Sequence, residues 1–268
     1  MLNILLVTQD DPFYVPIFFK ELLKKDISGK FVLKGIIIQP PLGKKSVKKL
    51  VLQMLHFYGY WGFLVMGIKF VSYKLLNYMA VNIFHGKMPG VFSAEHVILK
   101  NNLNIIHIKN INSKESLDFL KALNIDVVFS VAASQIFKKG ILELPRIGCF
   151  NIHTSKLPKN RGMMPNFWSL YNYDKDPVSA ITIHKMNDKL DDGEILIQHE
   201  FKLNPEEPLE HLIKRTKKIS AELFLKAIEK LDKGEQDFIK NDNTCATYNT
   251  FPVKKDIQAF KAKGLRIR

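Results

Sequence analysis

The sequence predicts an α/β fold, a doubly wound and mostly parallel sheet of the Rossmann-like kind. Short runs of β-branched and aliphatic residues alternate along the chain with longer stretches of helical periodicity. The 268 residues are 46% hydrophobic, which is enough to bury one sizeable core with a small appendage. Ligands of such sheets bind beyond the carboxyl ends of the strands, so we expect functional residues there.

Seven segments have the composition of strands. They are residues 2–7, 31–38, 104–108, 126–131, 149–152, 180–185 and 194–200. A helix is predicted over 13–25, where Asp11-Pro12 supplies a start signal. Another helix is predicted to begin at Ser113 and to end near Asn124, before the buried strand that contains Val127.

Residues 40–95 are the least expected part of this pattern. A lysine-rich run from Lys44 to Lys49 precedes an apolar and aromatic stretch, and an amphipathic pattern resumes at Lys69. We expect two helices that are broken near Gly59 or Gly62. The segment 44–85 fits a peripheral contact with an anionic membrane surface, and it also fits packing on its own domain or in a homodimer interface.

The domain organisation follows from these segments. A catalytic domain is predicted over 1–203, with the helical aromatic insertion at about 43–90, and a C-terminal helical extension over 204–268. Within the extension we expect a long helix from 206 to about 233, a short strand over 244–248 and a final helix over 253–263. Phe251-Pro252 separates the last two parts.

Composition narrows the class of protein. Two cysteines, and an amino terminus without the basic and apolar regions of a signal peptide, predict a reduced, cytoplasmic protein that could associate with a membrane. The Cys and His residues do not have metal-ligand spacing, so we expect no metal. The formal net charge of +14 suits a phosphate-bearing partner, either a nucleotide or tRNA.

The most informative run is Asn151-Ile152-His153, followed by Leu190-Asp191-Asp192-Gly193. Asn151 and His153 are two residues apart on an extended segment, so their side chains point to the same face. An Asn amide can donate to a carbonyl oxygen, and a later Asp can orient or charge the imidazole. The pattern therefore predicts three polar groups that converge on one reacting carbon. For an isolated Asn-x-His, the alternative is a turn cap beside a structural core histidine.

These residues belong to a longer ordered set that spans roughly residues 120–200. The set also contains Gly148-Cys149-Phe150, Lys156-Leu157-Pro158, Arg161-Gly162 and the run 180–186. It resembles the folate-dependent formyltransferases, a family that includes the methionyl-tRNA, glycinamide ribonucleotide and nucleotide-sugar N-formyltransferases. The resemblance implies transfer of a formyl group from 10-formyltetrahydrofolate to a primary amine.

The resemblance also implies a role for each residue of the motif. Asn151 would donate to the formyl oxygen, and His153 would hydrogen-bond the developing oxyanion. Asp191 would raise the pKa of the imidazole and help to remove the amine proton. Asp192 is the rival of Asp191, but the family aspartate follows the Leu directly, which selects Asp191.

The folate-binding residues carried over from the family form two loops. They are Gln135-Ile136-Phe137 and Asn187-Asp188-Lys189-Leu190, where the family holds the pterin mainly with backbone groups. The side chains of Ile136 and Phe137 would flank a flat heterocycle, or alternatively pack in the core.

Departures from the named relatives narrow the choice of acceptor amine. Thr8-Gln9-Asp10-Asp11-Pro12 replaces the Gly-rich phosphate turn expected of the glycinamide ribonucleotide enzyme. Residues 204–268 are too few for the additional domain that the resemblance implies for a methionyl-tRNA enzyme. An amino-sugar nucleotide is therefore the leading acceptor, and aminoacyl-tRNA is the first alternative. A non-catalytic folate-binding or partner-binding protein of this fold is the alternative from another class. Phe167 and Trp168 would stack on the acceptor or pack inward.

Overall fold

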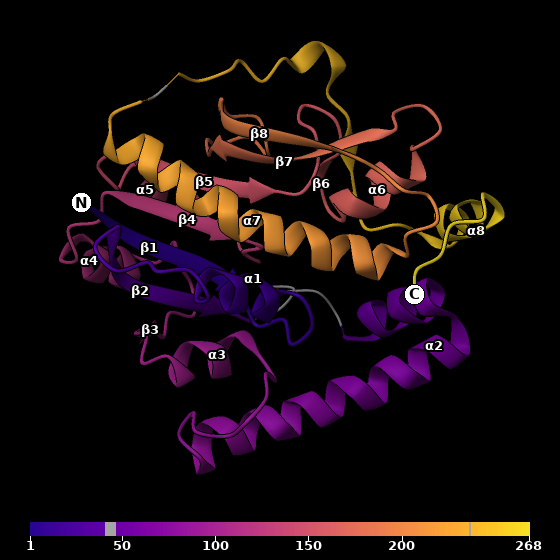
Figure 1. Ribbon diagram of the computed structural model, residues 1–268, viewed down its shortest axis with the longest axis horizontal. Coiled ribbons are helices and arrows are strands. Elements are labelled where there is room, and N and C mark those ends of the chain that lie inside the picture. The colour runs from indigo at the N-terminus through magenta and orange to yellow at the C-terminus, as the bar shows by residue number, and fades with distance from the viewer. Residues whose placement is uncertain (41–46, 236) are drawn as a thin grey trace.

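The computed structural model describes residues 1–40, 47–235 and 237–268, and it confirms the doubly wound sheet (Figure 1). The strand order is β3-β2-β1-β4-β5-β7-β8. Neighbours from β3 to β5 pair in parallel, whereas β7 is antiparallel to both β5 and β8. The strands are β1 (Leu2–Gln9), β2 (Phe31–Gln39), β3 (Ile105–Ile106), β4 (Val127–Val131), β5 (Gly148–His153), β7 (Val178–Lys185) and β8 (Ile195–Lys202). All seven predicted strands are present, although β3 is shorter than expected.

Helices cover both faces of the sheet because β1 is apolar on both faces. Leu2, Ile4 and Leu6 belong to one buried cluster, and Leu5 and Val7 belong to another. The first cluster is covered by α1 (Val15–Leu22), α3 (Ala94–Lys100) and α7 (Leu209–Asp232), and the second by α4 (Lys114–Lys121) and α5 (Lys139–Leu142). The order reverses between β1 and β4, so their carboxyl ends form the crevice where ligands of such sheets bind.

The first helix begins two residues later than predicted and ends at Leu22. The cause at its start is Asp11, whose carboxylate accepts hydrogen bonds from the backbone N–H groups of Phe13, Tyr14 and Val15. Asp11 thus satisfies the free donors that precede the helix.

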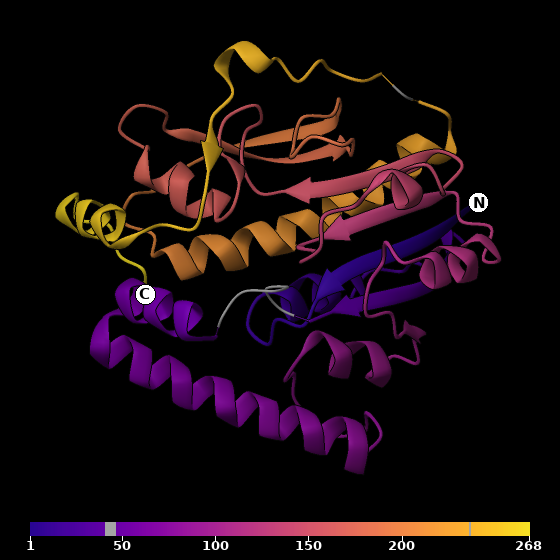
Figure 2. The ribbon, with the colours of Figure 1, turned by 180° about the vertical axis from the view of Figure 1, so that it is seen from behind.

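The insertion consists of α2 (Val47–Tyr78) and the π-helix η1 (Met79–Ile83). The predicted break lies at Gly59, whose φ of 74° and ψ of 172° interrupt the helix. Figures 1 and 2 show the longer part of α2 along the outer edge of the molecule, away from the sheet. The part of the predicted insertion over 43–46 lies outside the described residues.

The C-terminal part packs against α2 and α6 (Pro165–Tyr171). The helices α2, α6, α7 and α8 (Lys254–Ala262) share a third apolar cluster. In this cluster Phe167 stacks on Phe260 and packs at a tilted angle against Phe57. Between α7 and α8, the chain forms the 3-10 helix η2 (Asn243–Cys245) and the strand β9 (Tyr248–Asn249), which pairs with β6 (Arg161–Gly162). The domain boundary at 203/204 remains a prediction.

Candidate active site

Strand β5 presents Asn151 and His153 at its carboxyl end, as predicted. The adjacent antiparallel strand β7 places His184 directly opposite Asn151, and Thr182 opposite His153. Residues that face each other in antiparallel strands have neighbouring side chains. The register therefore brings a second histidine to Asn151.

The loop that carries Asp191 depends on two glycines. Asp191 has a φ of 50°, and a Cβ on Gly193 would lie 1.8 Å from the carbonyl oxygen of Lys185. Gly162 has a φ of +93° and donates its backbone N–H to Asp191 Oδ2 at 2.8 Å. A Cβ on Gly162 would lie 2.3 Å from the carbonyl oxygen of Asn249. Only glycine fits either place, and this accounts for both glycines of the motif.

The structure brings Asn151, His153 and Asp191 together. Asn151 Nδ2 lies 3.3 Å from Asp191 Oδ1, and His153 Nδ1 lies 3.6 Å from Asp191 Oδ2. His184 Nε2 lies 3.4 Å from Asp191 Oδ1 and 3.3 Å from Asn151 Nδ2. Asp191 is thus surrounded by the amide and two imidazoles. His184 was missed as a site residue, because its place depends on the strand register.

Asp191 is an anion although it is buried. Burial opposes ionisation, but the electrostatic effect of His153 in its protonated form, the hydrogen bond and electrostatic effect of His184, and the N–H of Gly162 outweigh it. These contacts hold the pKa of Asp191 well below its usual range. A fixed negative charge therefore lies at the centre of the site.

His153 is a neutral base at neutral pH. Burial lowers the pKa of His153, and Asp191 opposes this shift without overcoming it. Asp191 raises the pKa of the His153 imidazole, as predicted, but burial makes the net shift of this pKa downward. His153 Nε2 lies 2.9 Å from the carbonyl oxygen of Asn160, so Nε2 carries the proton and donates it. Nδ1, which faces Asp191, is then left as an acceptor.

A second polar network surrounds Arg161, which is fully buried. Its Nη1 donates to Asp192 Oδ1 at 2.6 Å, and it also contacts Asn243 Oδ1 and the Tyr248 hydroxyl, each at 2.7 Å. Its Nη2 donates to Asn241 Oδ1 at 3.0 Å. Asp192, the rival in the sequence motif, is therefore the partner of a buried guanidinium rather than a member of the cluster around His153.

Asn241 connects the C-terminal segment to the loop of Asp191. Its Nδ2 donates to the backbone carbonyls of Asp191 at 2.9 Å and Gly193 at 3.0 Å. Arg161 orients this amide from the other side. Asn241 thus fixes the backbone of the loop that carries Asp191. The sequence carried no motif for this contact.

The two predicted folate-binding loops differ in the exposure of their side chains. Residues 187–190 are exposed, whereas Phe137 is buried in the second apolar cluster. The side chain of Gln135 is occupied by the N–H of Ile111 and the carbonyl of Lys109, and Ile136 is exposed. Phe137 therefore follows the core alternative. In the backbone of this loop, the N–H of Gln135 donates to the Gln39 side chain, and the carbonyl of Ile136 accepts from Asn112.

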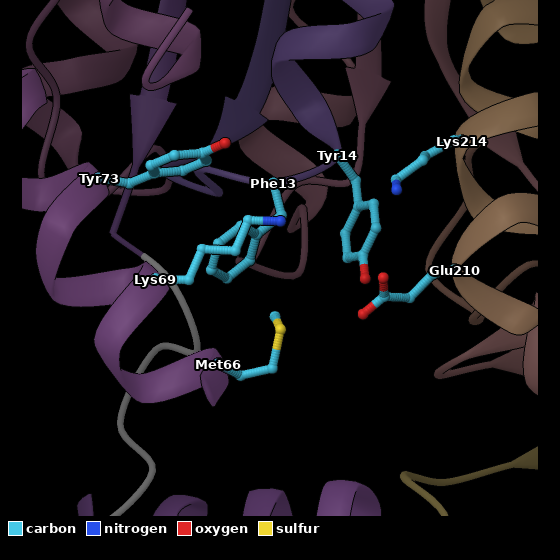
Figure 3. A pocket seen from close by; sticks show the side chains of 7 residues that line it. All are labelled: Phe13, Tyr14, Met66, Lys69, Tyr73, Glu210 and Lys214. Atoms are coloured by element: carbon cyan, nitrogen blue, oxygen red, sulfur yellow. The ribbon is translucent and has the colours of Figure 1, made fainter. Parts of the chain in front are cut away.

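A cavity of about 170 Å³ opens beside the β1–α1 loop (Figure 3). Phe13 and Tyr14 come from this loop, Lys69 and Tyr73 from α2, and Lys214 from α7; Met66 and Glu210 complete the lining. Figure 3 shows the Tyr14 hydroxyl and the Glu210 carboxylate pointing toward each other. Phe167, by contrast, is buried in the third apolar cluster, which follows the inward-packing alternative.

Comparison with known proteins shows what this chain is similar to. A family model described as formyl transferase matches residues 90–228. The chain is 38% identical over 156 residues to a methionyl-tRNA formyltransferase from Thermotoga neapolitana, covering 58% of this chain and 49% of that protein. It therefore spans about half the length of the curated relatives it matches.

Solved structures share the fold at low sequence identity. An N-formyltransferase from Helicobacter canadensis, in complex with folinic acid and dTDP-3-aminofucose, superposes with a TM-score of 0.57 at 17% identity, covering 99% of this chain and 84% of that one. A glycinamide ribonucleotide transformylase from Symbiobacterium toebii superposes with a TM-score of 0.58 at 13% identity, covering 90% of this chain and 95% of that one.

Proposed function

Because this chain belongs to the formyl transferase family, we propose that it transfers the formyl group of 10-formyltetrahydrofolate to a primary amine. The observation that carries the proposal is the cluster of Asn151, His153 and Asp191 at the carboxyl end of β5. The cluster combines an amide donor, a neutral imidazole and a fixed carboxylate. These are the groups that acyl transfer to an amine requires.

Asn151 supplies the donor for the formyl oxygen. Negative charge develops on this oxygen as the amine nitrogen attacks the formyl carbon, and Asn151 Nδ2 is the amide donor beside Asp191. A prearranged donor of this kind is worth about 2.7–4 kcal/mol in the barrier.

His153 and Asp191 handle the proton. As the new carbon–nitrogen bond forms, the amine must lose a proton, and His153 Nδ1 is a neutral acceptor next to the Asp191 carboxylate. Once protonated, Nδ1 can donate to the oxyanion, and the negative charge of Asp191 stabilises the imidazolium. His153 then delivers the proton to the folate nitrogen as the bond between that nitrogen and the formyl carbon breaks.

The folate would be held by the backbone of the two loops, 135–137 and 187–190. Support comes from their side chains, because Phe137 packs inward and Gln135 is engaged by its neighbours. Gln39 and Asn112 engage two backbone groups of the first loop, so the remaining main-chain groups of the two loops would read the flat heterocycle.

The leading acceptor is an amino-sugar nucleotide. The cavity beside the β1–α1 loop joins two lysine side chains, Lys69 and Lys214, to the aromatic rings of Phe13 and Tyr73. Amines attract phosphates, and rings stack on a base or a sugar. Strands β1, β4 and β5 are parallel neighbours, so the loop after β1 that lines the cavity and Asn151 near the end of β5 lie at the same end of the sheet.

Aminoacyl-tRNA is the second candidate acceptor. It is favoured by the sequence relatives, since the most similar of those reported above is a methionyl-tRNA formyltransferase. A basic chain with a net charge of +14 also suits a polyanion.

Mass spectrometry of the acceptor after incubation with 10-formyltetrahydrofolate tests the proposal. We expect one added formyl group on an amino-sugar nucleotide, and its loss in His153→Ala and Asp191→Ala. A formylated methionyl-tRNA would instead support the second candidate. Free formate without a formylated amine, or bound folate without turnover, would contradict the transferase assignment.

A further inference from the structure

The outer face of α2 carries a continuous apolar stripe. Its members follow one another at intervals of three or four residues, which places them on one side of the helix. The outer stripe consists of Trp61, Leu64, Ile68, Val71, Leu75 and Tyr78. Trp61 is 77% exposed, Ile68 61% and Leu75 60%, so the described part of the chain does not cover them.

The opposite face of α2 fixes the helix to the catalytic domain. Met66 is buried, Lys69 Nζ lies 5.4 Å from the ring centroid of Phe13, and Lys74 forms an ion pair with Asp10. Both lysines therefore turn inward, and the outer stripe carries no charge. The segment Leu50–Ile83 has the length and composition of a membrane span, but these contacts require it to lie beside the domain.

The sequence around the outer stripe is strongly one-sided in charge. It contains no Asp or Glu between Asp26 and Glu95, whereas it contains nine lysines in that interval, none of them between Lys49 and Lys69. Two exposed lysines, Lys48 and Lys87, lie on either side of the stripe in the sequence. Lysines beside an exposed apolar helix face complement the charge of an anionic bilayer.

We propose that the outer stripe of α2 binds the surface of an anionic lipid bilayer, with the helix lying in the plane of the surface. The apolar side chains enter the boundary between headgroups and acyl chains, to a depth of about 5–10 Å. Trp61 and Tyr78, near the two ends of the stripe, are residue types that favour this boundary.

A second copy of this chain fits the outer stripe less well. Helix pairs that recognise each other usually carry opposite charges beside the apolar seam. Here the flanking positions hold Val65, Ser72 and Met79 on one side and Tyr60, Gly67 and Lys74 on the other, and none of them is acidic. The stripe is also a single ridge about 27 Å long at 1.5 Å per residue. Such a ridge is narrow for a stable dimer, because a stable interface usually buries about 1,600 Å² in total.

Fluorescence of Trp61 tests the proposal directly. The chain has two tryptophans, so Trp168→Phe leaves Trp61 as the only one. We expect its emission to shift to shorter wavelength with vesicles that contain phosphatidylglycerol, and the shift to shrink as salt increases. Phosphatidylcholine vesicles should give little shift. An emission that is unchanged by anionic vesicles would overturn the proposal.

Flotation with the same vesicles compares matched variants. Ile68→Ser with Leu75→Ser should lower the partition coefficient by at least about ten-fold, because two large apolar side chains are lost from the contact. The control is Phe119→Ser, a residue of comparable exposure, 51%, on α4, and it should float like the unsubstituted protein. Equal flotation of both variants would contradict a role for the outer stripe.

The oligomeric state distinguishes binding of a bilayer from binding of a second copy of this chain. If sedimentation shows a dimer that does not float with vesicles, and if Ile68→Ser with Leu75→Ser converts this dimer to a monomer, the outer stripe is an interface with a second copy of this chain. None of these readouts depends on formyl transfer, so the lipid proposal and the proposed function succeed or fail separately.

Discussion

The loop around Asp191 and helix α2 each depart from the usual distribution of side chains: the first buries charged groups, and the second exposes apolar ones. Around Asp191, charged and polar groups are buried: Arg161 is fully buried, and His153, His184 and Asp191 are nearly so. Along α2, large apolar groups are exposed. Buried charges cost desolvation energy and exposed apolar patches cost solubility. The first arrangement is compensated by hydrogen bonds within the chain, whereas the second has no compensation within the described residues. The polar groups around Asp191 thus satisfy one another, whereas the exposed side chains of α2 contact solvent in the described part of the chain.

The largest expected effect concerns the carboxylate at the centre of the buried cluster. Asp191→Asn keeps an oxygen for the N–H of Gly162 but removes the negative charge that stabilises protonated His153. We expect kcat for formyl transfer to fall about 10²–10⁴-fold. Asp118→Asn, an exposed position on α4, is the matched control and should keep its rate. Equal rates for both variants would remove Asp191 from the mechanism.

Arg161 tests whether the buried network is structural. Arg161→Met leaves the Asp192 carboxylate and the Asn241 amide without their partner. We expect the free energy of unfolding to fall by about 3–5 kcal/mol in a urea titration. Arg146→Met, which removes an exposed ion pair with Asp126, should cost at most about 1 kcal/mol. Similar losses for the two variants would count against the network.

Asn241 tests whether the C-terminal segment positions the catalytic loop. Asn241→Leu removes two donors from the carbonyls of Asp191 and Gly193. We expect kcat to fall about ten-fold, which corresponds to about 1.4 kcal/mol, with little change in KM for the acceptor. Asn243→Ala, which touches only Arg161 Nη1 in this network, is the milder comparison. A change confined to KM would indicate acceptor binding instead of positioning.

The pH dependence follows from the imidazole of His153. Burial lowers the pKa of His153 from 6.5 in the folded protein, so its contribution to stability is full above 6.5 and declines as the pH falls toward the folded pKa. The NMR titration of His153 should have its midpoint below 6.5. Asp191 opposes the lowering, so Asp191→Asn should move the midpoint of the His153 titration further down. A midpoint above 6.5 would contradict this account of the site.

The smallest effect belongs to the outer stripe. Ile68→Ser should change the free energy of unfolding by no more than about 0.5 kcal/mol, because the side chain contacts mainly solvent. Met66→Ala, two residues away on the buried face, should cost about 2 kcal/mol or more. A large loss for Ile68→Ser would show that the stripe packs on its own chain.

Much of the fold was predictable from the sequence because its signals are local. The β-branched runs gave the seven strands, and Asp11-Pro12 marked the start of α1. The short helix α5 was missed, since four residues carry little periodicity. A break near Gly59 or Gly62 was predicted, and it lies at Gly59, because glycine is the residue that tolerates a φ of 74°.

The site was predictable only where one motif contains it. Asn151 and His153 share a strand, and the Leu-Asp-x-Gly pattern identified Asp191. His184 depends on the register of β5 with β7, and Asn241 reaches Asp191 from 50 residues away. Contacts of this kind follow from tertiary packing, which a single sequence does not reveal. The roles of the predicted site residues remain predictions until the variants are measured.

The most direct test of the central claim is a ¹³C NMR spectrum of the reaction with 10-formyltetrahydrofolate labelled at the formyl carbon. With an amino-sugar nucleotide, we predict that the formyl signal moves to that of a formamide, and that Asp191→Asn with bound folate does not produce this signal. A label that stays on the folate with every amine tested, or that moves equally fast in Asp191→Asn, would contradict a formyl-transfer centre at Asn151, His153 and Asp191.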